Sequence, residues 1–371
     1  MLARISRRFS VKLSLPSYKT KNIDENILPK EAETNFEELK DCLTDMMKIR
    51  RIEIVADNLY KSGKIRGFLH LSDGQEALAK GLSLALTDED PLITFYRDHG
   101  HAYMRGVSAH EIFGELLGKS TGNAKGKGGS MHFYNEETGF YGGYGIVGEN
   151  IPIGAGLAFA LKYKHKNNVA AITFGDGACN QGQLYEAANM CSLWKLPALF
   201  LIENNCYGMG TSVVRASANT QLYTRGDNAD IPGIRVDGQD VFAVKELIKF
   251  SKDYALEKGP LWIELRTYRY HGHSMSDPDI SYREKEEIQE IRKNQDPIEK
   301  IKTIVLENEV MTQEEITNLE KSIRKEINEV AKKAEEDPWP QETDIFSDVY
   351  DPGTQFVFRN VEHKNNFIAN R

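Results

Sequence analysis

The chain of 371 residues carries 47 lysines and arginines against 55 acidic residues, a formal net charge of −8, and 40% of its residues are hydrophobic. This is the composition of an ordinary globular protein, long enough for one large α/β domain with appendages. The acidic balance argues against a nucleic-acid-binding protein, and no apolar run approaches the roughly 20 residues that a membrane-spanning helix needs.

The first 23 residues are basic and contain no acidic residue. Serines lie between the basic residues, and apolar residues recur at helical spacing: Leu2, Ile5, Phe9 and Leu13. This composition is typical of a mitochondrial transit peptide, with a disordered basic tail as the alternative. We therefore predict a transit peptide over residues 1–23, an extended polar segment over 24–36, and a mature protein in the mitochondrial matrix.

Helical spacing of apolar residues then runs from Glu37 to Ser62. A loop follows that contains His70, and a histidine in a loop more often has no catalytic role than a catalytic one. Asp73 stands where it can cap a helix over residues 76–86.

Residues 92–96 are predicted to form a short strand, with Arg97 at its end. An arginine at a strand end can bind an anion through two N–H groups, and a solvated side chain is the alternative. We expect the histidines that follow, His99 and His101, to be structural.

Two glycine-rich stretches imitate nucleotide-binding motifs. Residues 114–120 are one residue short of a Walker loop and follow a helical pattern instead of a strand, which argues against that motif. Residues 143–148 fit the dinucleotide fingerprint literally, but no buried strand is predicted before them and no acidic residue stands about 20 residues later. A Rossmann-type oxidoreductase is therefore the disfavoured enzyme class.

The most informative stretch runs from residue 169 to residue 205. An apolar run over 169–174 leads into Gly175-Asp176-Gly177, and a second run over 198–202 leads into Glu203-Asn204-Asn205. Between them, apolar residues recur at helical spacing, so the stretch predicts a strand, a helix and a parallel strand. Both polar ends then lie at the carboxyl edge of a parallel sheet, where such sheets bind ligands.

The chemistry at these ends favours a metal bound with phosphate. Asp176 offers a carboxylate, Asn205 offers an amide oxygen, and Gly175 and Gly177 let the backbone approach an anion closely. The helix start expected after Ala178 adds free N–H groups. Magnesium takes few protein ligands and completes its shell with phosphate and water oxygens. The pattern predicts a magnesium–diphosphate site, with an ordinary turn as the alternative.

Further strands are predicted at 234–236 and 261–266, around a helix that Asp240 caps. Alternating strands and helices predict an α/β fold with a doubly wound, mostly parallel sheet over residues 37–283. Residues 284–371 are predicted to form charged helices up to about Glu336, followed by an irregular tail.

The Asp-Gly pair and the later Asn-Asn pair resemble the thiamine diphosphate signature. Four other stretches, HLSDGQEA at 70–77, GIVG at 145–148, YGMGTS at 207–212 and YRYHGHSMSDP at 268–278, are similar to those of one family of thiamine diphosphate-dependent 2-oxo acid dehydrogenases. That family comprises the alpha subunits of mitochondrial pyruvate dehydrogenase. The likeness covers the chain from about residue 35 to its end. Relatives often have Ala-Gln where this chain has Glu149-Asn150, and the region 135–139 is slightly longer here.

The resemblance implies a role for individual residues. Magnesium would be bound by Asp176, Asn205 and the backbone carbonyl of Tyr207, and Gly145 and Val147 would hold the pyrimidine ring through their backbones. Catalytic roles would fall to His70 and His273, and the substrate would meet His70, Tyr96 and Arg97. The full set of implied cofactor-binding residues is Tyr96, Arg97, Gly145, Val147, Asp176, Gly177, Ala178, Asn205, Arg269 and His273.

The resemblance also implies an activity and partners. The chain would decarboxylate pyruvate oxidatively and transfer the acetyl group to the lipoyl domain of a dihydrolipoyl acetyltransferase. It would act only with a beta subunit, as an α2β2 assembly. Ser274, Ser281 and Ser212 would match inhibitory phosphorylation sites of a dedicated kinase and phosphatase. A branched-chain 2-oxo acid or acetoin dehydrogenase, and a non-catalytic interaction module, are the alternatives.

Overall fold

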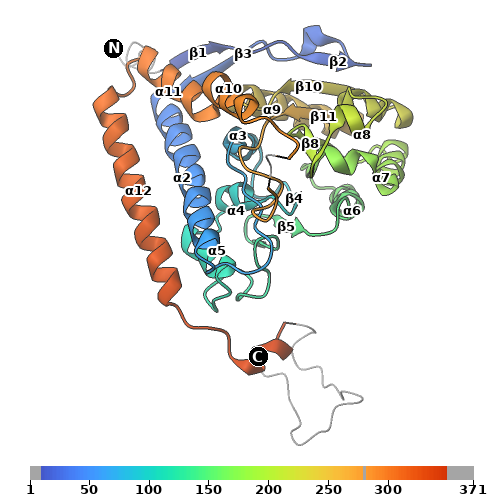
Figure 1. Ribbon diagram of the computed structural model, residues 1–371. Coiled ribbons are helices and arrows are strands. Elements are labelled where there is room, and N and C mark those ends of the chain that lie inside the picture. Colours follow the sequence, from blue (N-terminus) through green and yellow to red (C-terminus); the bar gives the residue numbers. More distant parts are fainter. Residues whose placement is uncertain (1–9, 279–280, 349–371) are drawn as a thin grey trace, which may run out of the picture.

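A seven-stranded sheet forms the centre of the computed structural model, which describes residues 10–278 and 281–348 (Figure 1). The strand order is β2-β10-β11-β7-β6-β4-β5; β2 runs antiparallel to β10, and the other neighbours are parallel. The strands are β2 (Lys19–Lys21), β4 (Leu92–Phe95), β5 (Phe140–Tyr144), β6 (Ala170–Gly175), β7 (Ala198–Asn204), β10 (Gly233–Asp237) and β11 (Leu261–Arg266). The predicted doubly wound, mostly parallel α/β fold is confirmed.

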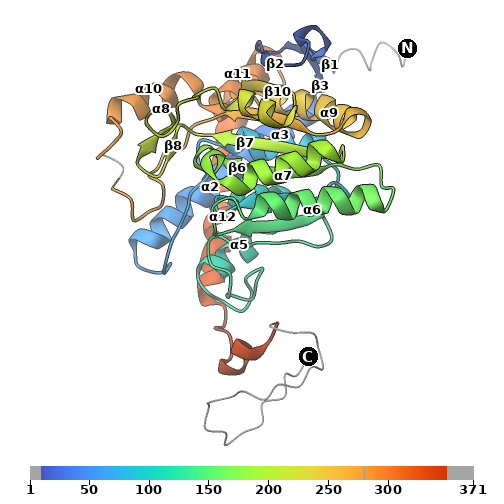
Figure 2. The ribbon, with the colours of Figure 1, turned by 90° about the vertical axis from the view of Figure 1, so that its right-hand side faces the viewer.

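Helices cover both faces of this sheet because the side chains of the strands alternate between two apolar clusters. Leu199 and Leu201 of β7 belong to one cluster, whereas Phe200 and Ile202 belong to the other. One face carries α6 (Asn150–Tyr163) and α7 (Gly182–Leu193), which Figure 2 shows in front of the sheet. The other face carries α2 (Phe36–Lys61), α3 (Glu76–Ala85), α4 (His99–Met104), α5 (Ala109–Leu116) and α9 (Val241–Lys258).

The C-terminal helices are α10 (Lys285–Gln295), α11 (Pro297–Glu307) and α12 (Gln313–Glu336). Of these, α11 and α12 pack against α2, as Figure 1 shows. Ile316, Ile323 and Ile327 of α12 are buried in the same apolar cluster as α2, so the predicted charged helices do pack on the domain. No helix in the described part of the chain is long and apolar enough to cross a membrane.

Small elements complete the fold near the carboxyl edge of the sheet. Strands β8 (Tyr207–Gly208) and β9 (Thr211–Ser212) form a hairpin that leads into the short helix α8 (Val213–Ala216). The 3₁₀ helices are η1 (Glu25–Ile27), η2 (Asp176–Asn180), η3 (Leu222–Ala229) and η4 (Glu342–Phe346).

Three local expectations were wrong. Asp73 does not cap α3, whose N-cap is Gln75 with no side-chain bond, because the Asp73 carboxylate binds the ring of His271 instead. A strand, β5, does precede residues 145–148; its Gly-Gly-Tyr sequence lacks the branched residues by which strands are predicted. The helix expected directly after Ala178 begins only at Gly182, since residues 176–180 form η2.

The N-terminal segment takes part in the fold from Ser10 onward. Strand β1 (Ser10–Ser14) pairs antiparallel with β3 (Glu31–Asn35), and β2 extends the edge of the main sheet beside β10. Val11 and Tyr18 are buried in the larger apolar cluster. The predicted transit peptide therefore overlaps residues that the fold uses; residues 1–9 lie outside the described part. The division of the chain into domains stays a prediction.

This packing predicts that residues 10–23 stabilise the folded protein. Deleting residues 1–23 removes β1, β2 and the buried side chains of Val11 and Tyr18, each worth roughly 1.5–3 kcal/mol. We expect the free energy of unfolding to fall by about 2–5 kcal/mol relative to a protein lacking only residues 1–9. Denaturant unfolding of both truncated proteins measures the difference, and equal stabilities would contradict the structural role of this segment.

Candidate active site

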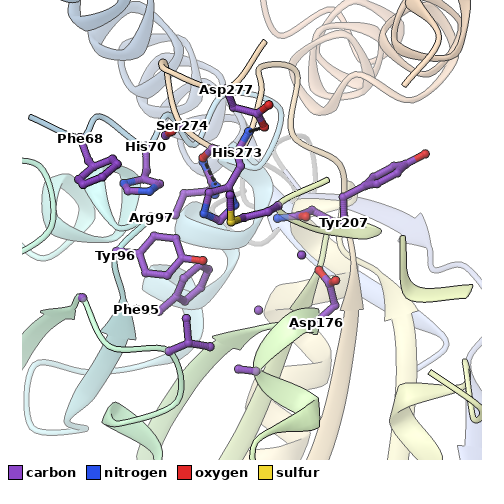
Figure 3. A pocket seen from close by; sticks show the side chains of 18 of the residues that line it. Phe68, His70, Phe95, Tyr96, Arg97, Asp176, Tyr207, His273, Ser274 and Asp277 are labelled. Atoms are coloured by element: carbon purple, nitrogen blue, oxygen red, sulfur yellow. Dashed lines mark hydrogen bonds between the residues drawn. The ribbon is translucent and has the colours of Figure 1, made fainter. Parts of the chain in front are cut away.

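A cavity of about 800 Å³ opens at the carboxyl ends of β4, β5, β6 and β7 (Figure 3). Its lining draws together segments that lie far apart in the sequence, from Phe68 to Pro278. The predicted site residues among its lining are His70, Tyr96, Arg97, Gly145, Val147, Asp176, Gly177, Ala178, Asn205, Tyr207, His273 and Ser274. Arg269, Ser212 and Ser281 are not among its lining.

Asp176 and Asn205 follow β6 and β7 directly, and both side chains are buried in the cavity wall. Asn205 Oδ1 is buried and has no hydrogen-bond partner within the described residues. Burial raises the pKa of Asp176 to about 6, against the lowering effect of hydrogen bonds and of Arg269. An unpartnered amide oxygen beside a carboxylate is a pair that a bound cation satisfies.

This donor pair fits magnesium with phosphate better than a metal held by protein alone. Within residues 10–278 and 281–348, no group of three His, Cys, Asp or Glu side chains could hold a metal ion. One carboxylate and one amide leave most of an octahedral shell to other oxygens, as in magnesium–phosphate sites. The ring of Tyr207 points away from the cavity in Figure 3, so only its backbone could serve the metal.

Two glycines leave room for an anion beside this pair. A Cβ on Gly177 would lie 3.5 Å from the Cα of Gly208, and a Cβ on Gly208 would lie 3.3 Å from the Cα of Gly177. The two backbone segments therefore face each other with no side chain between them. Larger residues would narrow the space in which a diphosphate could lie against the backbone.

Two buried arginines make this region electropositive. Arg97 is 2% exposed and donates to the carbonyl oxygens of Leu71 and His273, while its Nε has no partner in the described structure. Burial, followed by the charge of Arg269, lowers the pKa of Arg97 to about 10. Neither arginine forms an ion pair with a carboxylate in the described part of the chain, so a bound anion would offset an otherwise unfavourable burial.

Arg269 stands behind the cavity wall. Its terminal nitrogens donate to the backbone carbonyls of His271 and Met209 and to the hydroxyl of Tyr282. The side chain is 1% exposed, and its Nε lacks a partner within the described residues. It therefore positions the segments at 209 and 271 and contributes positive charge, instead of lining the cavity as the resemblance implied.

Three rings form the opposite wall of the cavity. The ring centroids of His70 and Tyr96 are 4.6 Å apart, those of His70 and His273 are 5.3 Å apart, and those of Tyr96 and His273 are 5.6 Å apart. Burial and the charge of Arg97 lower the pKa of His70 to about 2 and that of His273 to about 3. Both imidazoles are thus neutral at pH 7. Each can donate or accept a hydrogen bond at a ring nitrogen, and His70 Nδ1 is buried without a partner in the described structure.

His99 and His101 are structural, as expected. The ring of His99 bonds Glu53 at 2.9 Å and the carbonyl of Ser130 at 3.1 Å, and the ring of His101 bonds Glu203 at 2.7 Å. These buried bonds fix α4 against α2 and β7, beneath the cavity floor.

The segment 267–278 is anchored by a charged pair. His271 Nδ1 lies 2.8 Å from a carboxylate oxygen of Asp73. Burial opposes ionisation of both groups, but their mutual bond raises the pKa of His271 and lowers the pKa of Asp73. This pair places His273 and Ser274 at the cavity. The hydroxyl of Ser274 lies 2.9 Å from that of Ser276, whereas Ser281 is exposed in a turn.

Glu149-Asn150, where relatives often have other residues, has a structural explanation. Asn150 is fully buried and donates to the carbonyl of Thr173 at 2.8 Å, which ties the start of α6 to β6. Glu149 accepts from the backbone of Ile146 at 3.1 Å and shapes the turn that presents Gly145 and Val147. Both residues support the cavity rim and do not line the cavity.

A buried glutamate, which the sequence did not reveal, holds another wall of the cavity. The carboxylate of Glu115 accepts hydrogen bonds from the backbone N–H groups of Ala124, Gly126, Gly128 and Gly129, at 2.7, 3.0, 2.6 and 3.1 Å. It is fully buried at the end of α5. The loop that it organises continues to Ser130, whose hydroxyl accepts from the backbone of His70, and to Met131, which lines the cavity.

Two features of the sequence could have identified Glu115. An acidic residue stood on the apolar face of a helix, and a glycine-rich stretch followed it. Its glycines expose backbone N–H groups that can converge on one carboxylate.

Comparisons with known proteins identify the family. The profile of the family described as "Dehydrogenase E1 component" matches residues 44–343. The Arabidopsis thaliana pyruvate dehydrogenase E1 component subunit alpha-1, mitochondrial, is 52% identical over 86% of this chain and 82% of its own length. The corresponding Solanum tuberosum subunit is 50% identical over 93% and 87%, and the human somatic form is 50% identical over 85% and 80%. The chain belongs to the dehydrogenase E1 component family.

The bonds of Glu115 predict the effect of removing its charge. Glu115→Gln keeps the size of the side chain but turns an NH₂ group toward backbone donors, so we expect a loss of about 2–4 kcal/mol of stability. The loop should open, and trypsin should cleave faster after Lys125 and Lys127. Glu137→Gln, at an exposed position, is the matched control. Unchanged unfolding and proteolysis of Glu115→Gln would show that the carboxylate does not hold the loop.

Proposed function

We propose that this member of the dehydrogenase E1 component family is the alpha subunit of mitochondrial pyruvate dehydrogenase. It carries out the thiamine diphosphate-dependent oxidative decarboxylation of pyruvate and passes the acetyl group to a lipoyl group of the second component. The relatives at 50–52% identity carry the pyruvate dehydrogenase name, which disfavours the branched-chain and acetoin alternatives. The observation that carries the site assignment is the unpartnered Asn205 oxygen beside Asp176, in a cavity that is lined by the buried Arg97.

Different residues of the chain would bind the metal, the diphosphate and the pyrimidine ring. Asp176, Asn205 and the Tyr207 carbonyl would hold magnesium, and Arg97, with Arg269 behind it, would neutralise the diphosphate. Backbone groups of Gly177 and Ala178 would lie against the diphosphate, and those of Gly145 and Val147 against the pyrimidine ring. When bound, thiamine diphosphate supplies the carbon nucleophile and the electron sink of the reaction.

The rings of His70, Tyr96 and His273 would contact the substrate. His70 and His273 are neutral, so each can orient a substrate oxygen through a hydrogen bond at a ring nitrogen, whereas pKa values this low make both poor bases at pH 7. Tyr96 and Arg97 would orient the carboxylate of pyruvate beside them. The three rings also exclude water from the reacting atoms, which strengthens the interactions of Arg97 with charge.

An exposed apolar surface supports a partner chain. On α6 and α7, Ile153, Phe159, Tyr163, Leu193 and Trp194 are all at least 40% exposed, and the rings of Phe159 and Trp194 lie 5.8 Å apart. An apolar surface of this kind marks a protein interface. We assign it to the beta subunit of an α2β2 assembly, which would complete the active site. The lipoyl domain of the acetyltransferase would approach the cavity from its open side.

Co-expression with a beta subunit tests the function. We expect pyruvate decarboxylation that depends on thiamine diphosphate and magnesium, far lower turnover of branched-chain 2-oxo acids, and no activity from the alpha chain alone. In the assembled protein, Asp176→Ala should weaken cofactor binding by about 100-fold while assembly persists, because the single carboxylate of the metal site is lost. Asp253→Ala, at an exposed position of α9, is the control. Equal cofactor affinity of both variants in calorimetry would refute the metal assignment.

Phosphorylation at Ser274 would switch this site off. Ser274 is 8% exposed at the cavity, next to His273, whose backbone N–H donates to the carboxylate of Asp277. A phosphate adds roughly −1.5 to −2 charges beside Asp277 and so repels the segment from the diphosphate. We place secondary sites at Ser281 and Ser212 and infer a dedicated kinase and phosphatase.

Two variants check the regulatory role of Ser274. Ser274→Glu should lower the activity of the complex strongly, and Ser274→Ala should stay active and resist a pyruvate dehydrogenase kinase. The measurement is complex activity before and after kinase treatment. If kinase inhibits Ser274→Ala fully, and still does so when Ser281 and Ser212 are also alanine, this serine set has no regulatory role.

A further inference from the structure

A second cavity, of about 280 Å³, lies where α2, α10, α11 and α12 meet. Figure 1 shows α12 alongside α2, with α10 and α11 near the upper end of both. None of its lining residues belongs to the active-site cavity. Its charged lining residues are Arg50, Arg51, Asp296, Arg292, Glu299, Lys302, Glu320 and Arg324.

Only part of this charge is compensated. Arg50 pairs with Glu76 at 2.8 Å and with Asp296 at 3.1 Å, and Lys302 pairs with Glu299 at 2.7 Å. Three guanidinium groups, those of Arg51, Arg292 and Arg324, have no ion pair within the described residues. The exposed Glu320 carboxylate is the one acidic group of the lining left to face them. The five cations of the lining outnumber its three acids, and one positive charge is left over when Glu76, the second partner of Arg50, is counted as well.

Arg51 is the most deeply placed of these three arginines. One of its terminal nitrogens donates to Asn328 of α12 at 2.7 Å, but its Nε is buried without a partner in the described structure. Burial, and then the charge of Arg324, lowers the pKa of Arg51. The guanidinium groups of Arg51 and Arg324 repel each other, and an anion between them would relieve this repulsion.

We propose that this cavity is a binding site for a small anion with at least two negative charges on carboxylate or phosphate oxygens. Planar guanidinium groups bind such oxygens in pairs, and arginine is the residue that proteins use most for this recognition. The cavity is near the lower limit of small-molecule sites, so it suits an inorganic ion or a small acid and excludes a nucleotide.

The site is connected to the active-site segment through Tyr270. The guanidinium groups of Arg50 and Arg292 lie 5.0 and 5.4 Å from the centre of the Tyr270 ring. The Tyr270 hydroxyl donates to Asp296 at 3.0 Å, and its backbone N–H donates to the carbonyl of Asp73 at 3.1 Å. An anion that orders Arg292 therefore also orders the segment that carries His273.

Calorimetry on the assembled protein tests the binding site. Inorganic phosphate and succinate are titrated separately at constant ionic strength, with thiamine diphosphate and magnesium saturating so that the active site cannot bind the probe. We expect saturable binding of at least one probe with a dissociation constant of about 1 mM or below. Binding of phosphate alone identifies a phosphate-type ligand, and binding of succinate alone identifies a carboxylate-type ligand.

Three variants assign the binding to this cavity. Arg51→Gln and Arg324→Gln should each weaken binding by about tenfold or more, since each removes charge-assisted hydrogen bonds. Lys321→Gln, an exposed position on the same helix, makes the same charge change and should bind as the wild type does. Because Arg324 is itself exposed, its variant tests the site even if Arg51→Gln fails to fold.

Hydrogen exchange tests the connection to the active site. Binding of the probe should slow exchange of the Tyr270 backbone amide in the wild type and leave it unchanged in Arg324→Gln. Absence of saturable binding by both probes, or equal affinity of the wild type and Arg324→Gln, overturns the proposal. Binding without slower exchange at Tyr270 overturns its connection to the active-site segment.

Discussion

The parallel register between β6 and β7 is the constraint on which the site depends. Gly175 lies opposite Glu203, so the residues that follow each strand, Asp176 and Asn205, emerge at the same edge with an offset of one residue. Both strands are buried on both faces, and a shift of one residue would exchange their two apolar clusters. Core packing thus places the two proposed metal ligands at one edge of the sheet, where the backbone N–H of Asn205 also donates to the Asp176 carboxylate.

Around this edge, the loops that surround the cavity are held in place by buried carboxylates. Glu115 organises the loop at 124–129 through backbone N–H groups, Glu53 binds His99 and Ser72, and Asp73 binds His271. Each of these acids has partners for its oxygens, so its burial stabilises the structure. The cations at the cavity differ, because Arg97 and Arg269 are bonded mainly to neutral carbonyls. The named acids are thus neutralised within the protein, whereas the charges of Arg97 and Arg269 are not.

Much of this could be predicted from the sequence, for reasons that differ between elements. The strands at 170–175 and 198–204 are long apolar runs that end in polar residues, so periodicity located them within two residues. The strand β5 was not predicted because two glycines, Gly142 and Gly143, interrupt its aromatic residues, and glycine is depleted in strands. Gly143 is required there, since a Cβ would meet Asp98 at 2.3 Å. The strands within residues 10–21 were not predicted because their basic composition is typical of a transit peptide. Their partners, β3 and β10, lie further along the chain. Composition cannot reveal a pairing partner.

The behaviour of the arginines shows why charge alone could not locate the sites. Arg50 and Arg51 are neighbours on α2. Arg50 pairs with two acids from distant segments, whereas Arg51 lies near Arg324 of α12. An arginine at one position is therefore fully paired with acids, and an arginine at the next position has no ion pair within the described residues. The difference is set by which helix packs against which face of α2. Both proposed anion sites combine arginines that lack an ionic partner, buried in the case of Arg97 and half-buried beside the exposed Arg324 in the case of Arg51, and these combinations exist only once the helices have assembled.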